Sequence, residues 1–380
     1  MKLLYISDHM YTTGGSHQNS VMHYQCLLRA LTSENLVGVA LTAGRYIDQK
    51  DGFIHICGYQ SKFGQACNLL KMYSYCTNGR VAKKICRIID EKQITHVFLN
   101  SSEGRLARAI KKHNKEIIIM TFYHDVNANL MKQFIKEKGI KEIPRAYTTV
   151  WNERMMQEYA DYHITLNQRD AKLLEKYYGH GSDFFLPIAL EDNYSKATVA
   201  PQTNEAYEIL FAGVYYFPNV QGILWFCNQV LPRIKENVHL NIVGYNMEKL
   251  RGQINDSRVS IIGTVSNIQE WYHRCNLVIA PVFIGGGMKI KTAEAFMFGK
   301  QVVGTSESFE GYAEDIPKDL LEKHIFIKNG AEEFADAVQA AYRNAQVGQT
   351  VIPEVRETFV KLYSEEAGLK RIERLLEQVQ

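Results

Sequence analysis

The 380-residue sequence has no apolar run long enough to form a membrane-spanning helix. Its first residues, MKLLYISDHMY, lack the apolar core of a secretion signal. It also lacks a strong net charge, because 44 basic and 41 acidic residues leave only +3, which does not indicate a nucleic-acid partner. These absences predict a cytoplasmic protein whose only expected membrane contact is peripheral, at the inner face of the plasma membrane.

Paired cysteines and metal motifs are missing as well. The seven cysteines are odd in number and include no C-x-x-C pair, which fits reduced thiols and gives no zinc signature. No D-x-D motif stands near the end of an expected strand, so no metal is expected. The loop after the first expected strand, TTGGSHQNS, is not G-x-G-x-x-G, which argues against a nicotinamide oxidoreductase.

What is present is the composition of a globular protein, with 46% hydrophobic and 22% charged residues, and enough chain for two domains. Short apolar runs alternate with amphipathic stretches, the pattern of parallel, doubly wound α/β sheets. The pattern stops at the polar run EDNYSKATVAPQTNE and then restarts, so we expect two such domains divided near residues 190–205. The expected strands are Lys2–Ser7, Leu36–Leu41, Phe53–Cys57, His96–Leu99, Ile117–Thr121, Tyr162–Leu166, Glu208–Ala212, Leu240–Val243, Val259–Ile262, Leu277–Val282 and Gln301–Gly304. The expected helices are Val21–Leu31, 79–92, Arg105–Lys112, 151–160, Gln168–Tyr178, Leu224–Lys235, Asn267–Cys275 and Lys289–Phe298, with two more after Ile352.

The most informative stretch is VFIGGGMKIKTAEAFMFGKQVVGT, residues 282–305. A buried strand leads into three glycines, whose missing Cβ atoms let backbone amides approach a ligand. A helix follows, with Lys289 and Lys291 in its first turn and Glu294 one turn further on. Free N–H groups and the helix dipole favour anions at a helix N-terminus, and the lysines add positive charge. The stretch therefore predicts a phosphate site, although an ordinary βαβ crossover with a glycine-rich turn has the same outline.

Three other features admit two interpretations each. Gly14 and Gly15 lie between a strand and a helix, and form either a second backbone-amide nest or a plain turn. His124 directly follows a strand, where ligands bind in parallel sheets, but a loop histidine with ordinary partners fits equally. Residues 131–145, MKQFIKEKGIKEIPR, interleave lysines with apolar residues, which fits a surface for anionic lipids or a solvated helix and loop.

The second half of the chain resembles the retaining glycosyltransferases of family 4. The matching runs are ILFAGVYYFPNVQGILWFCNQVLPRI, LNIVG, VSIIGTVSNIQEWYHRCNLVIAPVFIGGGMKIKTAEAFMFGKQVVGT and FVKLYSEE; in the first half, YHD and ADYHITLNQRDAKLL are similar too. The resemblance implies the GT-B architecture, which has two Rossmann-like α/β domains with parallel sheets facing an interdomain cleft. It also implies an acceptor-binding domain over residues 1–190, a nucleotide-sugar donor domain over 205–363, and a C-terminal helix over 364–380 that packs back on the first domain.

The same resemblance implies roles for individual residues. Glu294 is similar to the second Glu of the family's E-x7-E pattern, which accepts hydrogen bonds from ribose hydroxyls, and Lys289 and Lys291 are similar to the basic pair that neutralises the diphosphate. With His124 near the reacting sugar, these are the expected catalytic residues. The expected donor-binding residues are Gly14, Gly15, Gly213, Asn219, Tyr245, Val265, Gly286, Gly287 and Met288.

Two departures from the family's pattern change these expectations. Gly286 stands where the first Glu of the pattern would fall, so backbone amides of Gly286, Gly287 and Met288 would hold the donor sugar. Val214 and Val220 stand where members often carry Arg and Lys, although Asn219 is in place. Neutralisation of the diphosphate would therefore depend more heavily on the two lysines.

The implied activity is the metal-independent, retaining transfer of a sugar from a UDP- or GDP-sugar to an acceptor hydroxyl, without a cofactor. A glycan or lipid-linked glycan acceptor would place it in the assembly of a capsule, O-antigen or exopolysaccharide, or of a glycoconjugate. Two alternatives share the fold and the donor. A sugar-nucleotide epimerase would need paired acid and base groups on the sugar, and a non-catalytic subunit would bind the donor and stabilise a partner transferase.

Overall fold

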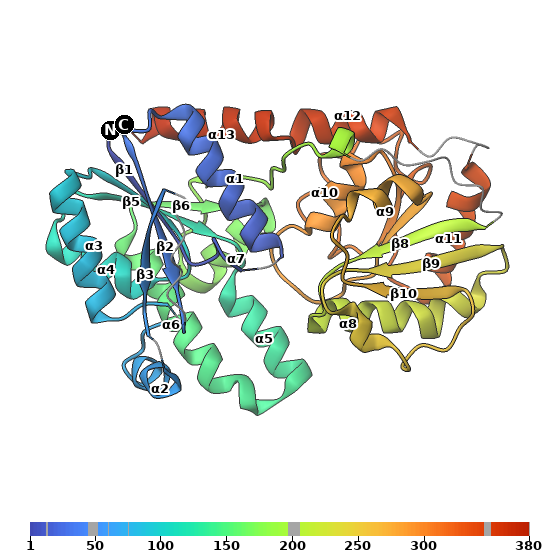
Figure 1. Cartoon of the computed structure of the whole chain (residues 1–380), viewed down its shortest axis with the longest axis horizontal. Coiled ribbons are helices and arrows are strands. Elements are labelled where there is room, and N and C mark those ends of the chain that lie inside the picture. Colours follow the sequence, from blue (N-terminus) through green and yellow to red (C-terminus); the bar gives the residue numbers. More distant parts are fainter. Residues whose placement is uncertain are drawn as a thin grey trace. The chain divides into compact units, whose positions relative to one another are not determined.

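A computed structural model describes residues 1–12, 14–44, 52–59, 61–74, 76–196, 206–345 and 351–379. The predicted linker at 190–205 lies outside the described residues from 197 on. The chain divides into two compact units, the first made of Met1–Pro187 and Gly368–Gln380 and the second of Ile188–Ala367. Figure 1 shows that each unit is a sheet with helices packed on it. Within the described part of the chain, no helix has the length and apolar character needed to cross a membrane.

The first unit contains a seven-stranded, entirely parallel sheet in the order β3-β2-β1-β4-β5-β6-β7. Its strands are β1 (Leu3–Ser7), β2 (Leu36–Thr42), β3 (Phe53–Cys57), β4 (His96–Asn100), β5 (Ile118–Tyr123), β6 (Tyr162–Thr165) and β7 (Phe184–Phe185). Its helices are α1 (Gly15–Ala30), α2 (Lys62–Leu70), α3 (Gly79–Lys92), α4 (Gly104–His113), α5 (Asn127–Lys138), α6 (Ile143–Tyr159) and α7 (Gln168–Tyr178), with a 3-10 turn at Ile140–Glu142. From Gly368 on, α13 (Glu365–Gln378) also belongs to this unit.

The second unit contains a six-stranded parallel sheet in the order β10-β9-β8-β11-β12-β13. Its strands are β8 (Tyr207–Ala212), β9 (Val238–Val243), β10 (Val259–Gly263), β11 (Leu277–Ala280), β12 (Gln301–Gly304) and β13 (Ile325–Ile327). Its helices are α8 (Phe217–Trp225), α9 (Gln269–Arg274), α10 (Ile290–Met297), α11 (Ala331–Asn344) and α12 (Pro353–Leu362). A π-helical turn at Phe226–Val230 and 3-10 turns at Tyr194–Lys196, Leu231–Arg233 and Met247–Leu250 complete the unit.

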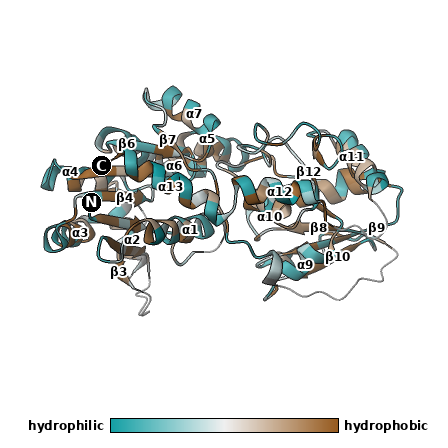
Figure 2. Ribbon diagram, turned by 90° about the horizontal axis from the view of Figure 1, so that it is seen from above, coloured by the Kyte–Doolittle hydropathy of each residue, from teal (hydrophilic) through white to brown (hydrophobic). Residues whose placement is uncertain are grey.

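Each sheet is buried because helices cover it, which explains why the strands are continuous in apolar residues rather than alternating. Strands β1, β4, β8 and β11 are buried at every position. Figure 2 shows the hydrophobic strands inside both units and helices with hydrophilic residues around them. Each unit has its own hydrophobic core between sheet and helices, as the alternating pattern predicts.

Most predicted elements are confirmed, and β2, β3, α3, α7 and β12 begin within the predicted limits and end within one residue of them. Several boundaries were wrong. Helix α6 begins at Ile143 rather than at residue 151. Helix α1 begins at Gly15 rather than Val21, because polar residues of its first turns are buried; the carbonyl of Ser20, for example, accepts a hydrogen bond from the Tyr5 hydroxyl. Helix α8 begins at Phe217 rather than Leu224, with Pro218 in the first turn, where proline is favoured.

The end of β11 was also wrong. The strand stops at Ala280 rather than Val282 because Pro281 has no N–H for the strand ladder. The irregular segment that leads from β11 to the glycine turn is therefore two residues longer than predicted. Pro281 and Val282, the two residues concerned, are buried.

Candidate functional site

The predicted donor residues lie at the carboxyl edge of the second sheet. Strand β8 pairs with β9 on one side and β11 on the other, so the direction in which the sheet grows reverses at β8. Such a reversal is where parallel sheets bind ligands. Gly213 follows β8 and the glycine turn Gly285–Gly287 follows β11, so both loops begin at the sheet edge where this reversal occurs.

The backbone at this edge is packed so closely that only glycine fits. A Cβ on Gly244, which follows β9 with φ of +143°, would lie 1.9 Å from the carbonyl oxygen of Gly213. Gly244 N–H donates to Gly263 O at 2.8 Å, and Gly213 N–H donates to Val243 O at 3.0 Å. The loops after three neighbouring strands therefore meet through main-chain atoms, which leaves room for the side chains that approach from α8 and α10.

Lys291 is the buried cation of this edge. It lies in the first turn of α10 and is 9% exposed, with its Nζ 2.7 Å from Asn219 Oδ1 and 4.4 Å from the ring centre of Phe211. Burial, and then repulsion from Lys289, lowers the pKa of Lys291 to about 7. Asn219 is fixed in turn by donating to Val214 O at 2.9 Å.

Gly213 completes this group. A Cβ built on Gly213 would lie 3.2 Å from Lys291 Nζ and 3.0 Å from Asn219 Nδ2. The structure thus brings together three residues that the sequence singled out separately, although 72 positions separate Asn219 from Lys291. Together they place the ammonium group of Lys291 beside the backbone of Gly213, which carries no side chain.

Lys289 precedes α10 and its charge is matched within the chain. Its Nζ donates to the carbonyls of Gly286 at 2.8 Å and Gly287 at 3.3 Å, and lies 2.8 Å from Glu307 Oε1. The side chains of Lys289 and Glu307 are only 14% and 17% exposed. Sequence reasoning missed Glu307, whose only signal is its position three residues after β12, at the same carboxyl edge.

The glycine turn itself presents backbone donors. Gly287 has φ of +56°, a left-handed conformation that favours glycine. Among the residues that the structure describes, the N–H groups of Gly286, Gly287 and Met288 make no hydrogen bond within the chain. Together with the N-terminus of α10, they can donate to an anion or to sugar hydroxyls.

Glu294 lies one turn further along α10 and is held by a tyrosine. Tyr272 Oη donates to Glu294 Oε2 at 2.8 Å, and the Tyr272 ring stacks on Phe298 with 5.1 Å between ring centres. Burial, and then the charge of Glu294, raises the pKa of Tyr272 well above its ordinary value, so Tyr272 stays a donor. Sequence reasoning missed Tyr272, because nothing in its local sequence distinguishes it from an aromatic residue that only packs.

Tyr245 and Val265, two of the expected donor-binding residues, lie on neighbouring loops. Tyr245 follows β9, is 53% exposed and accepts a hydrogen bond from the N–H of Tyr215 at 2.9 Å. Val265 lies in the loop between β10 and α9 and is half-buried. No hydrogen bond found in the described ranges joins either residue to Lys289 or Lys291, so their roles stay predictions.

His124, Gly14 and Gly15 belong to the first unit. The His124 ring contacts that of His9, which follows β1, with 4.8 Å between ring centres, and that of Phe122 at 4.9 Å. Burial, and then the neighbouring His9 and His23, lowers the pKa of His124 well below its ordinary value, so the imidazole is neutral at pH 7. Its Nε2 is buried and has no hydrogen-bond partner among the described residues.

Gly14 sits beyond β1 with φ of +96°, and a Cβ there would meet no atom within 4 Å, so the space around it is open. Gly15 begins α1. His9 is a residue that sequence reasoning missed, although it follows a strand end in the same way as His124. The first unit therefore has its own group of polar residues at the carboxyl ends of β1 and β5.

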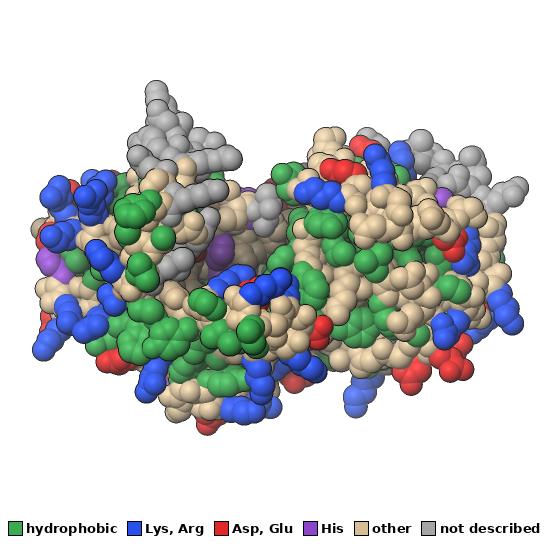
Figure 3. Space-filling model, turned by 90° about the horizontal axis from the view of Figure 1, so that it is seen from below, with side chains coloured by type: hydrophobic (Ala, Val, Ile, Leu, Met, Phe, Trp, Pro, Cys, Tyr) green, Lys and Arg blue, Asp and Glu red, His purple; other side chains and the backbone are tan. Residues whose placement is uncertain are grey.

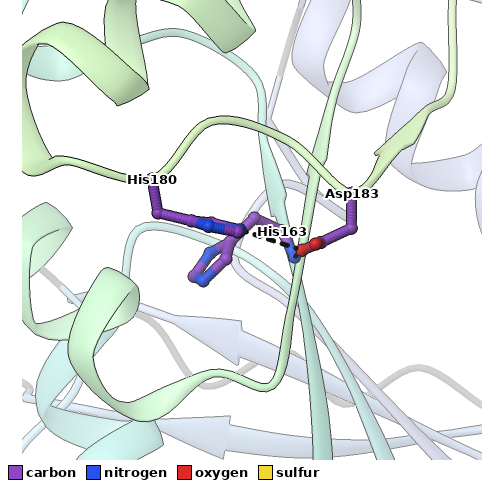
Figure 4. A group of neighbouring side chains, drawn as sticks. All are labelled: His163, His180 and Asp183. Carbon is purple, nitrogen blue, oxygen red and sulfur yellow. Dashed lines mark hydrogen bonds and ion pairs between the residues drawn. The ribbon is translucent and has the colours of Figure 1, made fainter.

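One group in the described ranges has the side-chain types of a metal site. Figure 4 shows His163, His180 and Asp183, whose nearest ligand atoms lie within 4.8 Å of one another. Asp183 Oδ2 already accepts the backbone N–H of His163 at 2.7 Å and lies 3.3 Å from His180 Nε2. His163 Nδ1 lies 3.1 Å from Tyr123 Oη, and burial lowers the pKa of His163 to about 4. These contacts give the group a structural role, because they attach the segment before β7 to strand β6.

The fold is the GT-B fold of glycosyltransferases. Residues 206–344 match the family model described as Glycosyl transferases group 1, so the second unit carries that domain. No curated protein sequence matches the chain. Several solved structures match over nearly the full length of both chains, but they are distant in sequence and support the fold alone.

Three of these structures illustrate the similarity. Sucrose-phosphate synthase from Thermosynechococcus elongatus aligns with a TM-score of 0.73 and 14% identity, over 100% of this chain and 98% of its own. HepE from Anabaena, in complex with UDP, aligns with a TM-score of 0.69 and 13% identity over 100% of both chains. WaaG, a glycosyltransferase involved in lipopolysaccharide biosynthesis, aligns with a TM-score of 0.66 and 13% identity, over 98% of this chain and 99% of its own. The predicted GT-B architecture, as two parallel-sheet Rossmann-like halves, is thus confirmed.

Proposed function

We propose that this protein is a retaining glycosyltransferase of family 4, which moves a sugar from a nucleotide diphosphate sugar to an acceptor hydroxyl. The observation that carries the proposal is Lys291, a buried ammonium beside Asn219 and the bare backbone of Gly213. A buried cation at the open edge of a sheet is costly unless an anion shares the site. A diphosphate is such an anion.

The chemistry needs stabilisation of a leaving group rather than a strong acid. Breaking the bond from sugar to phosphate leaves negative charge on the diphosphate, which Lys289, Lys291 and the N-terminus of α10 would stabilise. Glu294, oriented by Tyr272, would accept hydrogen bonds from the ribose hydroxyls. The backbone amides of Gly286, Gly287 and Met288 would hold the sugar in place of the carboxylate that is the first Glu of the family's pattern. We propose no metal and no cofactor for these steps.

The neutral His124 suits a position near the reacting sugar, because an uncharged imidazole does not repel the positive charge that develops on the sugar ring. Its pKa, well below the ordinary value, keeps it uncharged over the physiological range. The open space at Gly14 and the helix start at Gly15 would accommodate the diphosphate or acceptor.

Two structural neighbours support the substrate classes that we propose. HepE from Anabaena has been determined with UDP and with UDP-glucose, which favours a UDP-sugar over a GDP-sugar as donor. WaaG takes part in lipopolysaccharide biosynthesis, which favours a glycan or lipid-linked glycan acceptor and a role in the assembly of a cell-surface polysaccharide. We propose that the protein acts in the cytoplasm, at the inner face of the plasma membrane.

A thermal-shift panel of UDP-, GDP-, ADP- and TDP-sugars tests the donor. A ligand that binds only the native state at about 100 times its Kd adds about 2.7 kcal/mol to the free energy of unfolding, which raises the melting temperature by several degrees. We expect one nucleotide to give this rise. The absence of a rise with all four would contradict the proposal.

A non-catalytic donor-binding subunit is the second candidate, because Lys289 is already neutralised by Glu307 and Gly286 replaces a carboxylate. Incubation of the isolated chain with the donor and a panel of lipid-linked and free glycans separates the two functions. Transfer to an acceptor, with nucleotide release only in its presence, supports the enzyme. Donor binding without transfer until a partner protein is added supports the subunit.

Replacing Glu307 with Gln is expected to strengthen binding of UDP by about fivefold. A diphosphate must compete with Glu307 for Lys289, and a partly exposed pair of this kind contributes about 1 kcal/mol. Isothermal titration of wild type, Glu307→Gln and the control Glu314→Gln, an exposed carboxylate in the same loop, measures the effect. Weaker binding in Glu307→Gln would show instead that Glu307 positions Lys289 for the phosphate.

A further inference from the structure

The α5–α6 hairpin exposes an unusual amount of apolar surface for its size. Ile140 at its tip is 80% exposed, and along α6 Ile143, Tyr147 and Trp151 are 49%, 62% and 39% exposed. Their spacing places them on one face of the helix, and the solvent face of a surface helix is normally polar. Contiguous apolar surface of this kind marks an interaction site.

The two helices of the hairpin enclose a groove of about 530 Å³ between them. Met131 and Ile135 line it from α5, and Tyr147, Val150 and Trp151 line it from α6. Tyr147 and Trp151 stack with 6.5 Å between ring centres, so their rings form one continuous wall. The volume of the groove and its largely apolar lining suit a hydrocarbon chain.

Basic side chains border this apolar surface. Lys132 and Arg154 line the groove, while Lys136, Lys141 and Arg145 are exposed around the tip. In Figure 1 the hairpin lies at the lower edge of the first unit, and Figure 3, seen from that side, shows hydrophobic side chains there with Lys and Arg along their border.

The acidic residues of the hairpin do not cancel this charge. Glu142 lies 3.8 Å from Arg145 and forms an ion pair with it. Glu153 is buried and accepts the N–H groups of Asn127 at 2.6 Å and Ala128 at 2.9 Å, which anchors the start of α5. The carboxylates that remain on the outer surface are Glu137 and Glu158.

We propose that the α5–α6 hairpin docks the protein on a bilayer that contains acidic phospholipids. Ile140 and the Tyr147–Trp151 wall enter the boundary between headgroups and acyl chains, and the groove takes up an acyl chain. Lys136, Lys141 and Arg145 lie at the level of the headgroup phosphates. The aromatic residues of the apolar face match the boundary with the acyl chains, and the lysines and arginine around that face match the headgroup layer.

The position of the hairpin links this surface to the rest of the first unit. Helix α5 begins at Asn127, three residues after His124, and its start is anchored on the buried Glu153. A lipid-linked acceptor held in the bilayer would therefore reach the unit beside the carboxyl end of β5. Only this consequence rests on the proposed function; the docking itself does not.

Co-sedimentation of the full chain with vesicles tests the proposal. We expect binding to vesicles of phosphatidylcholine mixed with phosphatidylglycerol, and at least about tenfold weaker binding to phosphatidylcholine alone. The double variant Lys136→Glu/Lys141→Glu should weaken binding to the mixed vesicles at least about tenfold, and Ile140→Ser about fivefold. Lys84→Glu and Leu28→Ser, exposed residues of α3 and α1, are the matched controls and should bind as wild type does.

Tryptophan fluorescence gives an independent measurement. Emission should shift to shorter wavelength on mixing with the acidic vesicles, and Trp151→Phe should remove that shift while binding persists. Equal binding by wild type and the double variant would overturn the proposal. So would a concentration-dependent dimer that Ile140→Ser dissociates, because a second copy would then cover the face.

The outcome is separable from that of the proposed function. Thermal shifts by nucleotide sugars are measured without vesicles, and Ile140→Ser should show the same shifts as wild type. Loss of vesicle binding with retained nucleotide binding would therefore concern the hairpin alone, and the reverse result would concern the donor site alone.

Discussion

Replacing Lys291 with Met should lower kcat for sugar transfer by about 10³-fold without lowering the stability of the protein. Loss of one preorganised group that stabilises developing negative charge costs about 10²–10³ in rate. Lys291 sits in a low-dielectric position, so its effect should fall at the upper end of that range. The melting temperature should stay the same or rise, because Met fills a similar volume and removes a buried charge.

The control for this prediction is Lys235→Met, an exposed lysine of the same unit, which should leave both quantities unchanged. Initial rates at saturating donor, with thermal unfolding of each variant, provide the measurement. If Lys291→Met transfers sugar at the wild-type rate, the diphosphate does not bind beside Lys291, and the donor site must be placed elsewhere.

The lowered pKa of Lys291 predicts the pH dependence of donor binding. Below pH 7 the ammonium is already charged, so UDP binds without taking up a proton. Above pH 7 the free protein holds a neutral amine, and the diphosphate must recruit a proton to it. The affinity for UDP should therefore fall by up to about tenfold per pH unit above pH 7, and Lys291→Met should remove this dependence. Calorimetry in buffers of different ionisation enthalpy measures the proton uptake directly.

Replacing Gly222 with Ala should destabilise the second unit by at least about 3 kcal/mol. Gly222 lies in α8, and a Cβ there would stand 1.7 Å from the carbonyl oxygen of Pro281, which follows β11. A backbone carbonyl cannot rotate away as a side chain can, so the helix or the strand end must move. Because Asn219 is on the same helix, UDP binding should weaken along with stability.

Urea unfolding measures this effect, with Gly330→Ala as the matched control. Gly330 has φ of −86°, and its nearest neighbour, 3.3 Å from an added Cβ, is the flexible end of Glu333, so a cost below about 1 kcal/mol is expected. A midpoint for Gly222→Ala equal to that of Gly330→Ala would mean that α8 can shift freely over β11.

Local patterns in the sequence were enough for the architecture. Continuous apolar runs, separated by amphipathic stretches, predicted two parallel sheets, because a strand buried on both faces must be apolar throughout. Gly299, with φ of +59°, ends α10 as predicted, since glycine adopts the left-handed conformation at little cost. Boundaries failed where a local signal was weak, as in the polar first turns of α1 and the aromatic run before α8.

The sequence also identified the stretch that we propose as an anion site, because glycines, a helix start and two lysines adjoin along the chain. What it could not supply was the state of those lysines. Lys289 is neutralised by Glu307, and Lys291 is buried against Asn219 and Gly213, through contacts that span 18 and 72 positions. Tyr272 on Glu294 and His9 on His124 are likewise distant in the chain. Charge state and side-chain orientation depend on burial and on neighbours brought in by other strands, and no local pattern of residues encodes which neighbours those will be.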